Sequence, residues 1–237
     1  MRLVSVGGPQ RNAAILIILS RMISADDALT RLRAGNQRFK SNIRDLDTIA
    51  NNARRSELIL AQEPFAIILG CSDSRVPAEI VFDQGLGDLF VIRVAGNIIA
   101  PSLLGSVEFC AVKHGARLVI VLGHTHCGAI EATVSELKQP SGNRSPNLQS
   151  IVNRIQPSVQ TLLEAGVQND DEQLVKLATR ANVRASVSQL RHGSQVLEGL
   201  IAHEGLKIVG AEYLLETGEV DFFTENEAQP QESAIEH

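Results

Sequence analysis

Residues 65–77 read FAIILGCSDSRVP, an apolar run followed by a polar turn. The run 65–69 has no polar alternation, which is typical of a strand buried on both faces of a parallel sheet. A second apolar run, 118–122, is followed after Gly123 by residues 124–128, which read HTHCG. Ligands of open α/β sheets bind beyond the carboxyl ends of the strands. The pattern therefore predicts an α/β protein whose mostly parallel central sheet is flanked by helices, with a site at this edge.

Three side chains at these two strand ends form a metal-ligand set. If the strands are neighbours, Cys71, His124 and Cys127 converge on one point. Two thiolates and one imidazole are the ligands of zinc sites that leave the fourth position to water or substrate. Asp73 is then either the fourth ligand or a carboxylate beside the metal, and Arg75 can bind it bidentately. The residues alone predict a catalytic zinc site, with a structural zinc protein as the alternative.

Three motifs, in this order and spacing, resemble the β-class carbonic anhydrases: CSDSRV at 71–76, RVAGN at 93–97 and HTHCGA at 124–129. The resemblance covers about residues 23–223. It implies a zinc enzyme with one Zn²⁺ per subunit, which hydrates carbon dioxide reversibly to bicarbonate and a proton by attack of zinc-bound hydroxide. It also implies catalytic roles for Asp73 and Arg75, with Asp73 moving onto zinc in an inactive state of some members.

The same resemblance implies three substrate-binding residues. Gln62, nine residues before Cys71, matches a substrate-orienting glutamine, and Phe90 resembles a residue that lines the apolar side of the pocket. The backbone N–H of Gly128 would face the developing bicarbonate at the start of a helix. A carbonyl sulfide or carbon disulfide hydrolase on the same zinc site remains the alternative activity.

Composition limits the class of protein and of partner. The 237 residues are enough for one substantial domain. A formal net charge of -5, without a basic stripe interleaved with aromatic residues, argues against nucleic acid as a partner. No membrane partner is expected. Only Cys110 remains once two of the three cysteines are assigned to zinc, so the sequence predicts no disulfide within the chain and a cytoplasmic location.

The chain divides into three parts. Residues 1–22 are an N-terminal extension whose apolar run 13–19 is flanked by Arg11 and Arg21. Two interpretations stay open for it: a signal peptide that would export the protein, or a natural start at Met22. The catalytic domain is expected over 23–223, and an acidic polar tail over 224–237.

Helices and strands are expected from periodicity and capping signals. Ser24 is the predicted N-cap of a helix that ends near Phe39, and the last two strands should form a hairpin at one edge of the sheet. The resemblance implies that the leading helices pack on a partner subunit, in a homodimer or in a homotetramer built as a dimer of dimers. The other expected helices are 43–61, 77–82, 101–114, 128–138, 148–165 and 170–200, the last broken near Gly193, and the other expected strands are 88–94, 206–215 and 219–223.

Overall fold

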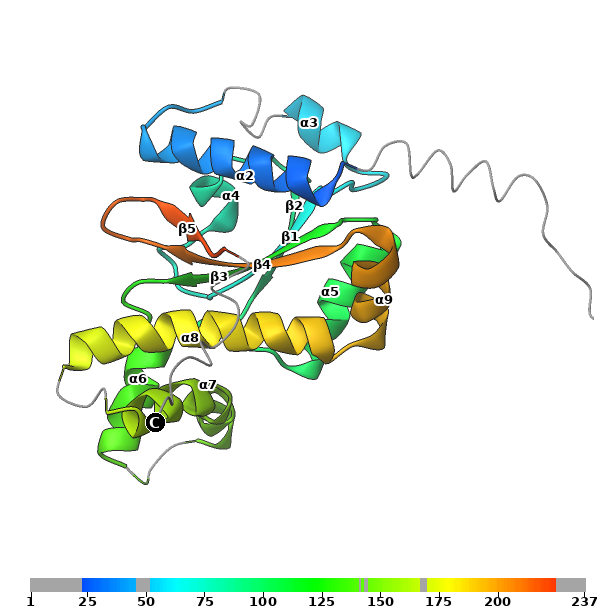
Figure 1. Ribbon diagram of the computed structural model, residues 1–237. Helices are drawn as coiled ribbons and strands as arrows, with labels where there is room; N and C mark the ends of the chain where they lie inside the picture. The colour runs from blue at the N-terminus through cyan, green and yellow to red at the C-terminus, as the bar shows by residue number, and fades with distance from the viewer. Residues whose placement is uncertain (1–22, 46–51, 141, 143–144, 167–169, 225–237) are drawn as a thin grey trace, which may run out of the picture.

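The computed structural model describes residues 23–45, 52–140, 142, 145–166 and 170–224 (Figure 1). The predicted N-terminal extension, and the predicted tail apart from Thr224, lie outside these residues. One five-stranded sheet has the order β2-β1-β3-β4-β5. Its first four strands by position are parallel, and β5 is antiparallel to β4. The strands are β1 (Ala66–Gly70), β2 (Leu89–Arg93), β3 (Leu118–His124), β4 (Lys207–Tyr213) and β5 (Val220–Phe222).

The mostly parallel sheet and the C-terminal edge hairpin are therefore confirmed. Strands β1 and β3 are buried along their whole length, as their unbroken apolar sequences predict. Successive β1 side chains enter opposite cores, since Ile68 packs in one buried cluster and Ile67 in the other. Aliphatic side chains thus fill both faces of the central strands.

Helices cover both faces of the sheet. Figure 1 shows α2 (Ala25–Lys40) and α4 (Ala78–Val81) on one face, and α5 (Pro101–Lys113), α8 (Asp171–His192) and α9 (Gln195–Glu204) on the other. Helices α6 (Gly128–Lys138) and α7 (Pro146–Glu164) form a further layer beyond α8. Within the described residues, no helix combines the length and the apolar content needed to cross a bilayer.

Two local predictions are confirmed at helix ends. The Ser24 hydroxyl accepts a hydrogen bond from the Asp27 amide at 3.1 Å, so Ser24 is the N-cap of α2. The long C-terminal helical region is broken at Gly193, where α8 ends, and the Ser194 hydroxyl accepts from the Leu197 amide to begin α9.

The predicted helix over 43–61 is wrong in extent. Residues 43–45 and 58–61 are outside any helix, 46–51 lie outside the described residues, and only α3 (Asn52–Glu57) is helical. The apolar residues that suggested a longer helix have no core to enter, because Ile59 is 76% and Leu60 94% exposed. Leu58 instead packs over the backbone of Gly87.

Candidate metal centre

The three predicted ligands meet at the carboxyl edge of the sheet. Strands β1 and β3 are parallel neighbours, with Gly70 opposite Leu122. Cys71 follows the first strand, His124 ends the second, and Cys127 precedes α6. Their sulfur and nitrogen ligand atoms all lie within 4.8 Å of one another, and all three residues are buried. Adjacent parallel strands thus bring together side chains that are far apart in sequence.

The donor set and its hydrogen bonding fit a zinc ion. The ring Nδ1 of His124 lies 2.8 Å from the Thr125 carbonyl oxygen, to which its N–H donates, and this leaves the Nε2 lone pair toward the two sulfurs. Nε2 is buried and has no hydrogen-bond partner in the described part of the chain. A buried unpaired nitrogen is costly, and coordination by a metal would satisfy it. Two thiolates and an imidazole are the ligands that zinc prefers.

The pKa values of the three predicted ligands also favour a bound cation. The Cys127 thiol, as a hydrogen-bond donor, lowers the pKa of Cys71 to about 4, with a smaller contribution from the Gly96 amide 3.4 Å from the Cys71 sulfur. The same contact and burial raise the pKa of Cys127. Burial lowers the pKa of His124, but the Cys71 sulfur outweighs it and the net direction is upward. Two adjacent thiolates repel each other, so a divalent cation is needed to hold both ionised.

Asp73 is held beside this group by Arg75, as predicted for the pair. Oδ1 of Asp73 accepts from the Arg75 backbone N–H and from Nε, both at 2.9 Å, and Oδ2 accepts from Nη2 at 2.8 Å. These bonds hold the pKa of Asp73 well below its usual range. Oδ2 also lies 3.9 Å from Nε2 of His124. The geometry therefore presents an ionised, oriented carboxylate to the position between the ligands.

Arg93, at the end of β2, fixes the backbone that carries Cys71 and Asp73. Its Nε donates to the Cys71 carbonyl at 2.9 Å and its Nη2 to the Asp73 carbonyl at 2.5 Å. The Ser72 amide donates to the Val94 carbonyl at 3.3 Å, which continues the pairing of β1 with β2 into the turn. In the sequence, Arg93 is marked only as the first residue of the motif RVAGN at 93–97. Its place at the end of a strand next to the Cys71 strand is the signal that could have indicated this role.

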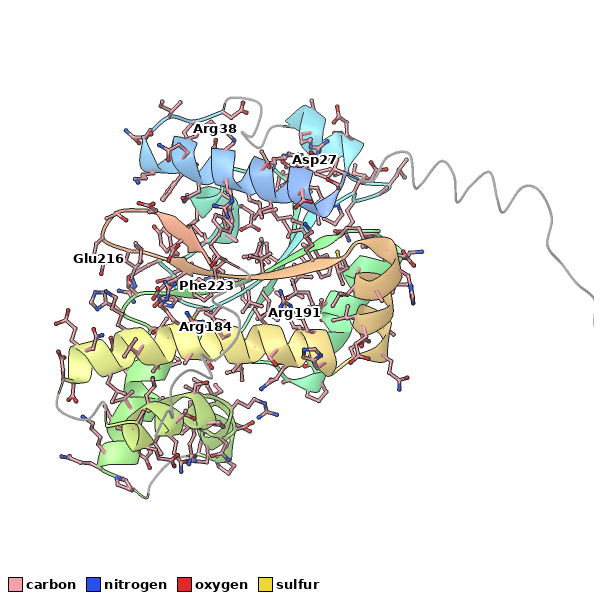
Figure 2. The ribbon with its side chains drawn as sticks, viewed as in Figure 1. Asp27, Arg38, Arg184, Arg191, Glu216 and Phe223 are labelled. Carbon is pink, nitrogen blue, oxygen red and sulfur yellow. The ribbon has the colours of Figure 1, made fainter. Side chains whose placement is uncertain are left out.

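Glu216, in the β4–β5 connection (labelled in Figure 2), fixes the turn between His124 and Cys127. Its carboxylate accepts from the Thr125 hydroxyl at 3.0 Å and lies 2.7 Å from Nε2 of His126. His126 has a φ of 53°, the left-handed region. The His126 carbonyl accepts from Nη2 of Arg75 at 3.0 Å. Glu216 was not predicted from the sequence, because no local pattern indicates its contact with the residues that follow β3.

The three predicted substrate-binding residues occupy two places. Gly128 begins α6 directly after Cys127, and a Cβ added there would meet no atom within 4 Å, so open space lies beside this helix N-terminus. Phe90 pairs with Ile67 of β1, three residues before Gly70, or roughly 10 Å back along the strand.

Gln62 and Phe90 gather around His114 instead. Gln62 is exposed and lines a cavity of about 640 Å³ together with Leu60 and His114. The Phe90 ring centroid lies 6.3 Å from those of His114 and Phe109. Within one chain, Gln62 and Phe90 therefore lie beside the edge strand β2, whereas the three metal-ligand residues lie at the ends of β1 and β3.

The fold and the site define a class of protein, an α/β protein whose three-residue group at the carboxyl edge of a mostly parallel sheet could hold a metal ion. The family model for carbonic anhydrase matches residues 66–220, and the chain belongs to the β-class carbonic anhydrases, which are zinc lyases. It is 39% identical to the carbonic anhydrase of Mycolicibacterium smegmatis over 193 residues, 80% of this chain and 89% of that protein. It is 37% identical to carbonic anhydrase 2 of Mycobacterium tuberculosis over 190 residues, 79% of this chain and 87% of that one.

Solved structures show the same fold. The β-carbonic anhydrase CcaA superposes with a TM-score of 0.68 at 25% identity, covering 86% of this chain and 92% of that chain. A tetrameric β-carbonic anhydrase from Sordaria macrospora superposes with a TM-score of 0.65 at 22% identity, covering 73% of this chain and 86% of that chain.

Proposed function

We propose that this protein hydrates carbon dioxide reversibly to bicarbonate and a proton, with one Zn²⁺ per chain held by Cys71, His124 and Cys127. The observation that carries the proposal is the bidentate Arg75–Asp73 pair, whose Oδ2 lies 3.9 Å from Nε2 of His124. A closed structural zinc site needs four protein ligands and no charged pair beside them. Family membership supports the same reaction.

A zinc ion bound here would lower the pKa of a coordinated water toward neutrality and so supply a nucleophile at physiological pH. The protein's own part is to orient that nucleophile and to meet the charge that develops on the substrate. Asp73 can accept a hydrogen bond at Oδ2 from the nucleophile's remaining O–H, which would turn a lone pair toward the carbon atom of carbon dioxide. Arg75 keeps this carboxylate ionised and fixed. The N–H of Gly128 at the start of α6, beside open space, is suited to an oxygen of bicarbonate.

Direct assays on the zinc-loaded protein test the proposal. Carbon dioxide hydration is followed by stopped flow with a pH indicator, and hydrolysis of carbonyl sulfide and carbon disulfide by release of hydrogen sulfide. The expected result is a higher kcat/KM for carbon dioxide than for either sulfur compound. A higher kcat/KM for carbonyl sulfide or carbon disulfide would assign the site to that hydrolysis instead.

The three cysteines are expected to divide into two classes in a thiol titration. Burial raises the pKa of Cys110 to about 12, and this residue is fully buried in the core. A disulfide reagent at pH 8 should therefore modify Cys71, whose pKa is low, in the metal-free native protein but not after zinc is added, while Cys110 stays unmodified until the protein unfolds. Cys110→Ala serves as the control, since it should leave both counts unchanged. Equal modification with and without zinc would contradict the ligand assignment.

All three cysteines are free in the structure. Since both ligand thiols must stay reduced to bind zinc, they support our proposal that the protein works in a reducing compartment, the cytoplasm.

We further propose that a second copy of the chain covers the face around His114. This face carries exposed apolar side chains, with Leu60 94% and Phe109 53% exposed, next to the edge strand β2. Exposed apolar groups of this kind mark interaction surfaces. The predicted substrate-binding residues Gln62 and Phe90 lie on the same face, so a dimer formed here would place them at a subunit boundary. The predicted packing of the leading helices on a partner agrees with this assignment.

A double variant, Leu60→Asp with Phe109→Asp, is expected to halve the molar mass measured by light scattering, because each subunit would bury two added carboxylates against a copy of itself. Val196→Asp, at a 44% exposed position on α9, is the matched control and should keep the wild-type mass. An unchanged mass in the double variant would place the interface elsewhere.

A further inference from the structure

The connection between β4 and β5 lies beside the turn between two of the predicted metal ligands. Strands β3 and β4 are parallel neighbours, so the residues that follow them meet at the carboxyl edge of the sheet. The Thr125 amide donates to the Tyr213 carbonyl at 3.0 Å, and the Leu215 amide donates to the Thr125 hydroxyl at 3.0 Å. These backbone contacts bring Glu216, the next residue of the connection, to the ligand turn (Figure 2).

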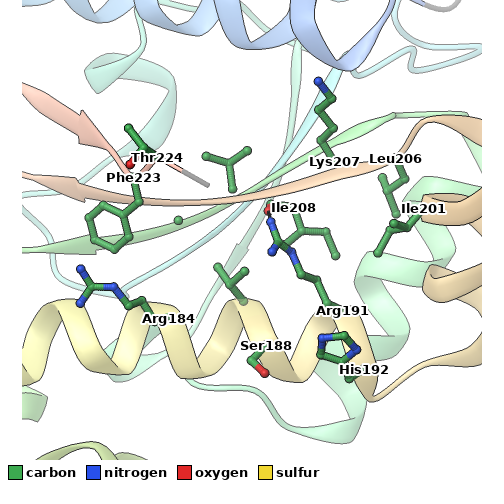
Figure 3. Close-up of a pocket in the computed structure, with 13 residues that line it drawn as sticks. Arg184, Ser188, Arg191, His192, Ile201, Leu206, Lys207, Ile208, Phe223 and Thr224 are labelled. Carbon is green, nitrogen blue, oxygen red and sulfur yellow. Dashed lines mark hydrogen bonds between the residues drawn. The ribbon is translucent and has the colours of Figure 1, made fainter. Parts of the chain in front are cut away.

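The β4–β5 hairpin is anchored on both faces of the sheet. On one face, Asn36 of α2 donates from Nδ2 to the Gly218 carbonyl and accepts at Oδ1 from the Val220 amide, both at 2.9 Å. On the other face, the Phe223 ring lies over α8, with its centroid 5.1 Å from the guanidinium carbon of Arg184 (Figure 3). The hairpin is therefore a fixed support for the side chains of its connection.

Glu216 holds His126 in a backbone conformation that most side chains disfavour. Oε1 of Glu216 accepts from the ring Nε2–H of His126 at 2.7 Å, and Oε2 accepts from the Thr125 hydroxyl at 3.0 Å. The φ of His126 is 53°, and a residue other than glycine persists in this left-handed region where surrounding contacts hold it. The two bonds from Glu216 thus fix the direction of the His126 carbonyl.

That carbonyl reaches the Arg75 side chain. Nη2 of Arg75 donates to the His126 carbonyl at 3.0 Å and to Oδ2 of Asp73 at 2.8 Å, while Nε donates to Oδ1 of Asp73 at 2.9 Å. The Arg75 side chain is 51% exposed, so hydrogen bonds set its orientation more than packing does. Loss of the His126 contact should therefore loosen the guanidinium, and with it the carboxylate that it orients.

We propose that Glu216 is a positioning residue for the reaction at the metal centre. Through the His126 carbonyl it holds Arg75 in place, and Arg75 in turn sets the direction in which Oδ2 of Asp73 points. This inference rests on the proposed function, in which Asp73 orients the nucleophile. It makes the β4–β5 hairpin part of the site, although the three metal ligands lie on other elements.

Exchange of the Arg75 Nε–H with water, followed by NMR on the full-length, zinc-loaded protein, tests the proposal. Because exposed ion pairs are individually weak, Glu216→Ala is expected to speed this exchange roughly 2–5-fold. The same variant should lower kcat/KM for carbon dioxide by a similar factor, roughly 2–5-fold, and keep one zinc per chain.

Two further variants serve as rescue and control. Glu216→Gln should restore both quantities to within about twofold of wild type, because its amide oxygen can accept from the His126 ring and its NH2 can donate to the Thr125 hydroxyl. Glu219→Ala removes a carboxylate of the same hairpin that is 48% exposed, against 52% for Glu216, and is paired with Lys40 at 2.6 Å. This matched control should change neither quantity.

A double variant shows whether Glu216 acts through Asp73. In an Asp73→Asn background, Glu216→Ala should cause no further loss of kcat/KM, because the carboxylate that Glu216 helps to orient is already absent. A further loss in that background would overturn the proposal and show that Glu216 acts on the ligand turn directly.

An unchanged Arg75 exchange rate in Glu216→Ala would also overturn the proposal. This measurement requires no turnover, so it tests the role of Glu216 separately from the proposed function. A wild-type protein that binds zinc but does not hydrate carbon dioxide would overturn the proposed function, while the exchange rate would still decide whether Glu216 holds the Arg75–Asp73 pair.

Discussion

Replacement of His124 by alanine is expected to abolish both zinc binding and carbon dioxide hydration. His124 is fully buried, its Nδ1–H is bonded to the Thr125 carbonyl, and its Nε2 is directed at the two sulfurs. Alanine leaves two thiols and no third donor within the group. Because loss of a group that only orients a ligand already costs roughly 10–100-fold in metal affinity, loss of the ligand itself should exceed that range and reduce hydration to the uncatalysed rate.

Zinc content by mass spectrometry and stopped-flow hydration, measured on the same preparation, check this expectation. His203→Ala removes an exposed histidine from α9 and should keep full zinc content and activity. Retention of one zinc per chain by His124→Ala would show that the metal is held elsewhere.

Asp73→Asn is expected to lower kcat/KM for carbon dioxide by roughly 10–100-fold, as for other groups that orient a metal site, and to leave one zinc per chain. The substitution preserves shape, but the amide has one acceptor oxygen and presents an NH2 donor at the other position, so it cannot both accept from the nucleophile's O–H and keep the bidentate bond with Arg75. The loss should fall on kcat, because Asp73 acts on the nucleophile and the substrate is neutral. Asp26→Asn, at an exposed ion pair with Lys207, is the matched control.

An Asp73→Asn protein with full activity would show that the carboxylate is a structural ion pair only. An Asp73→Asn protein that loses its zinc would show instead that Asp73 is a ligand in the resting state. Both outcomes differ from the expected pattern of full zinc content with low kcat.

The ligand set could be predicted from the sequence because it depends on strand order alone. Apolar runs 65–69 and 118–122 each end at a ligand, and parallel neighbours bring these ends to one edge. The helix start at Ser24 and the break at Gly193 could also be predicted, because each is set by residues within one turn of the helix end. Local patterns therefore account for the elements and for the core of the site.

The parts that could not be predicted depend on contacts between distant segments. Glu216, after β4, reaches Thr125 and His126, which follow the neighbouring strand β3, and nothing near residue 216 in the sequence indicates this contact. The helix expected over 43–61 failed because periodicity shows an apolar stripe and not what the stripe packs against. Exposed Leu60 and Ile59 belong to a face for which we propose a second copy as the partner.

Reconstitution of the metal-free protein with zinc tests the central claim most directly. Carbon dioxide hydration by stopped flow, measured at increasing zinc-to-protein ratios, is predicted to rise linearly and to stop rising at one zinc per chain, as the reactive Cys71 thiol becomes protected. Zinc bound at one per chain with the Cys71 thiol protected and the protein folded, but with no hydration at any ratio, would contradict the account and leave a structural zinc site.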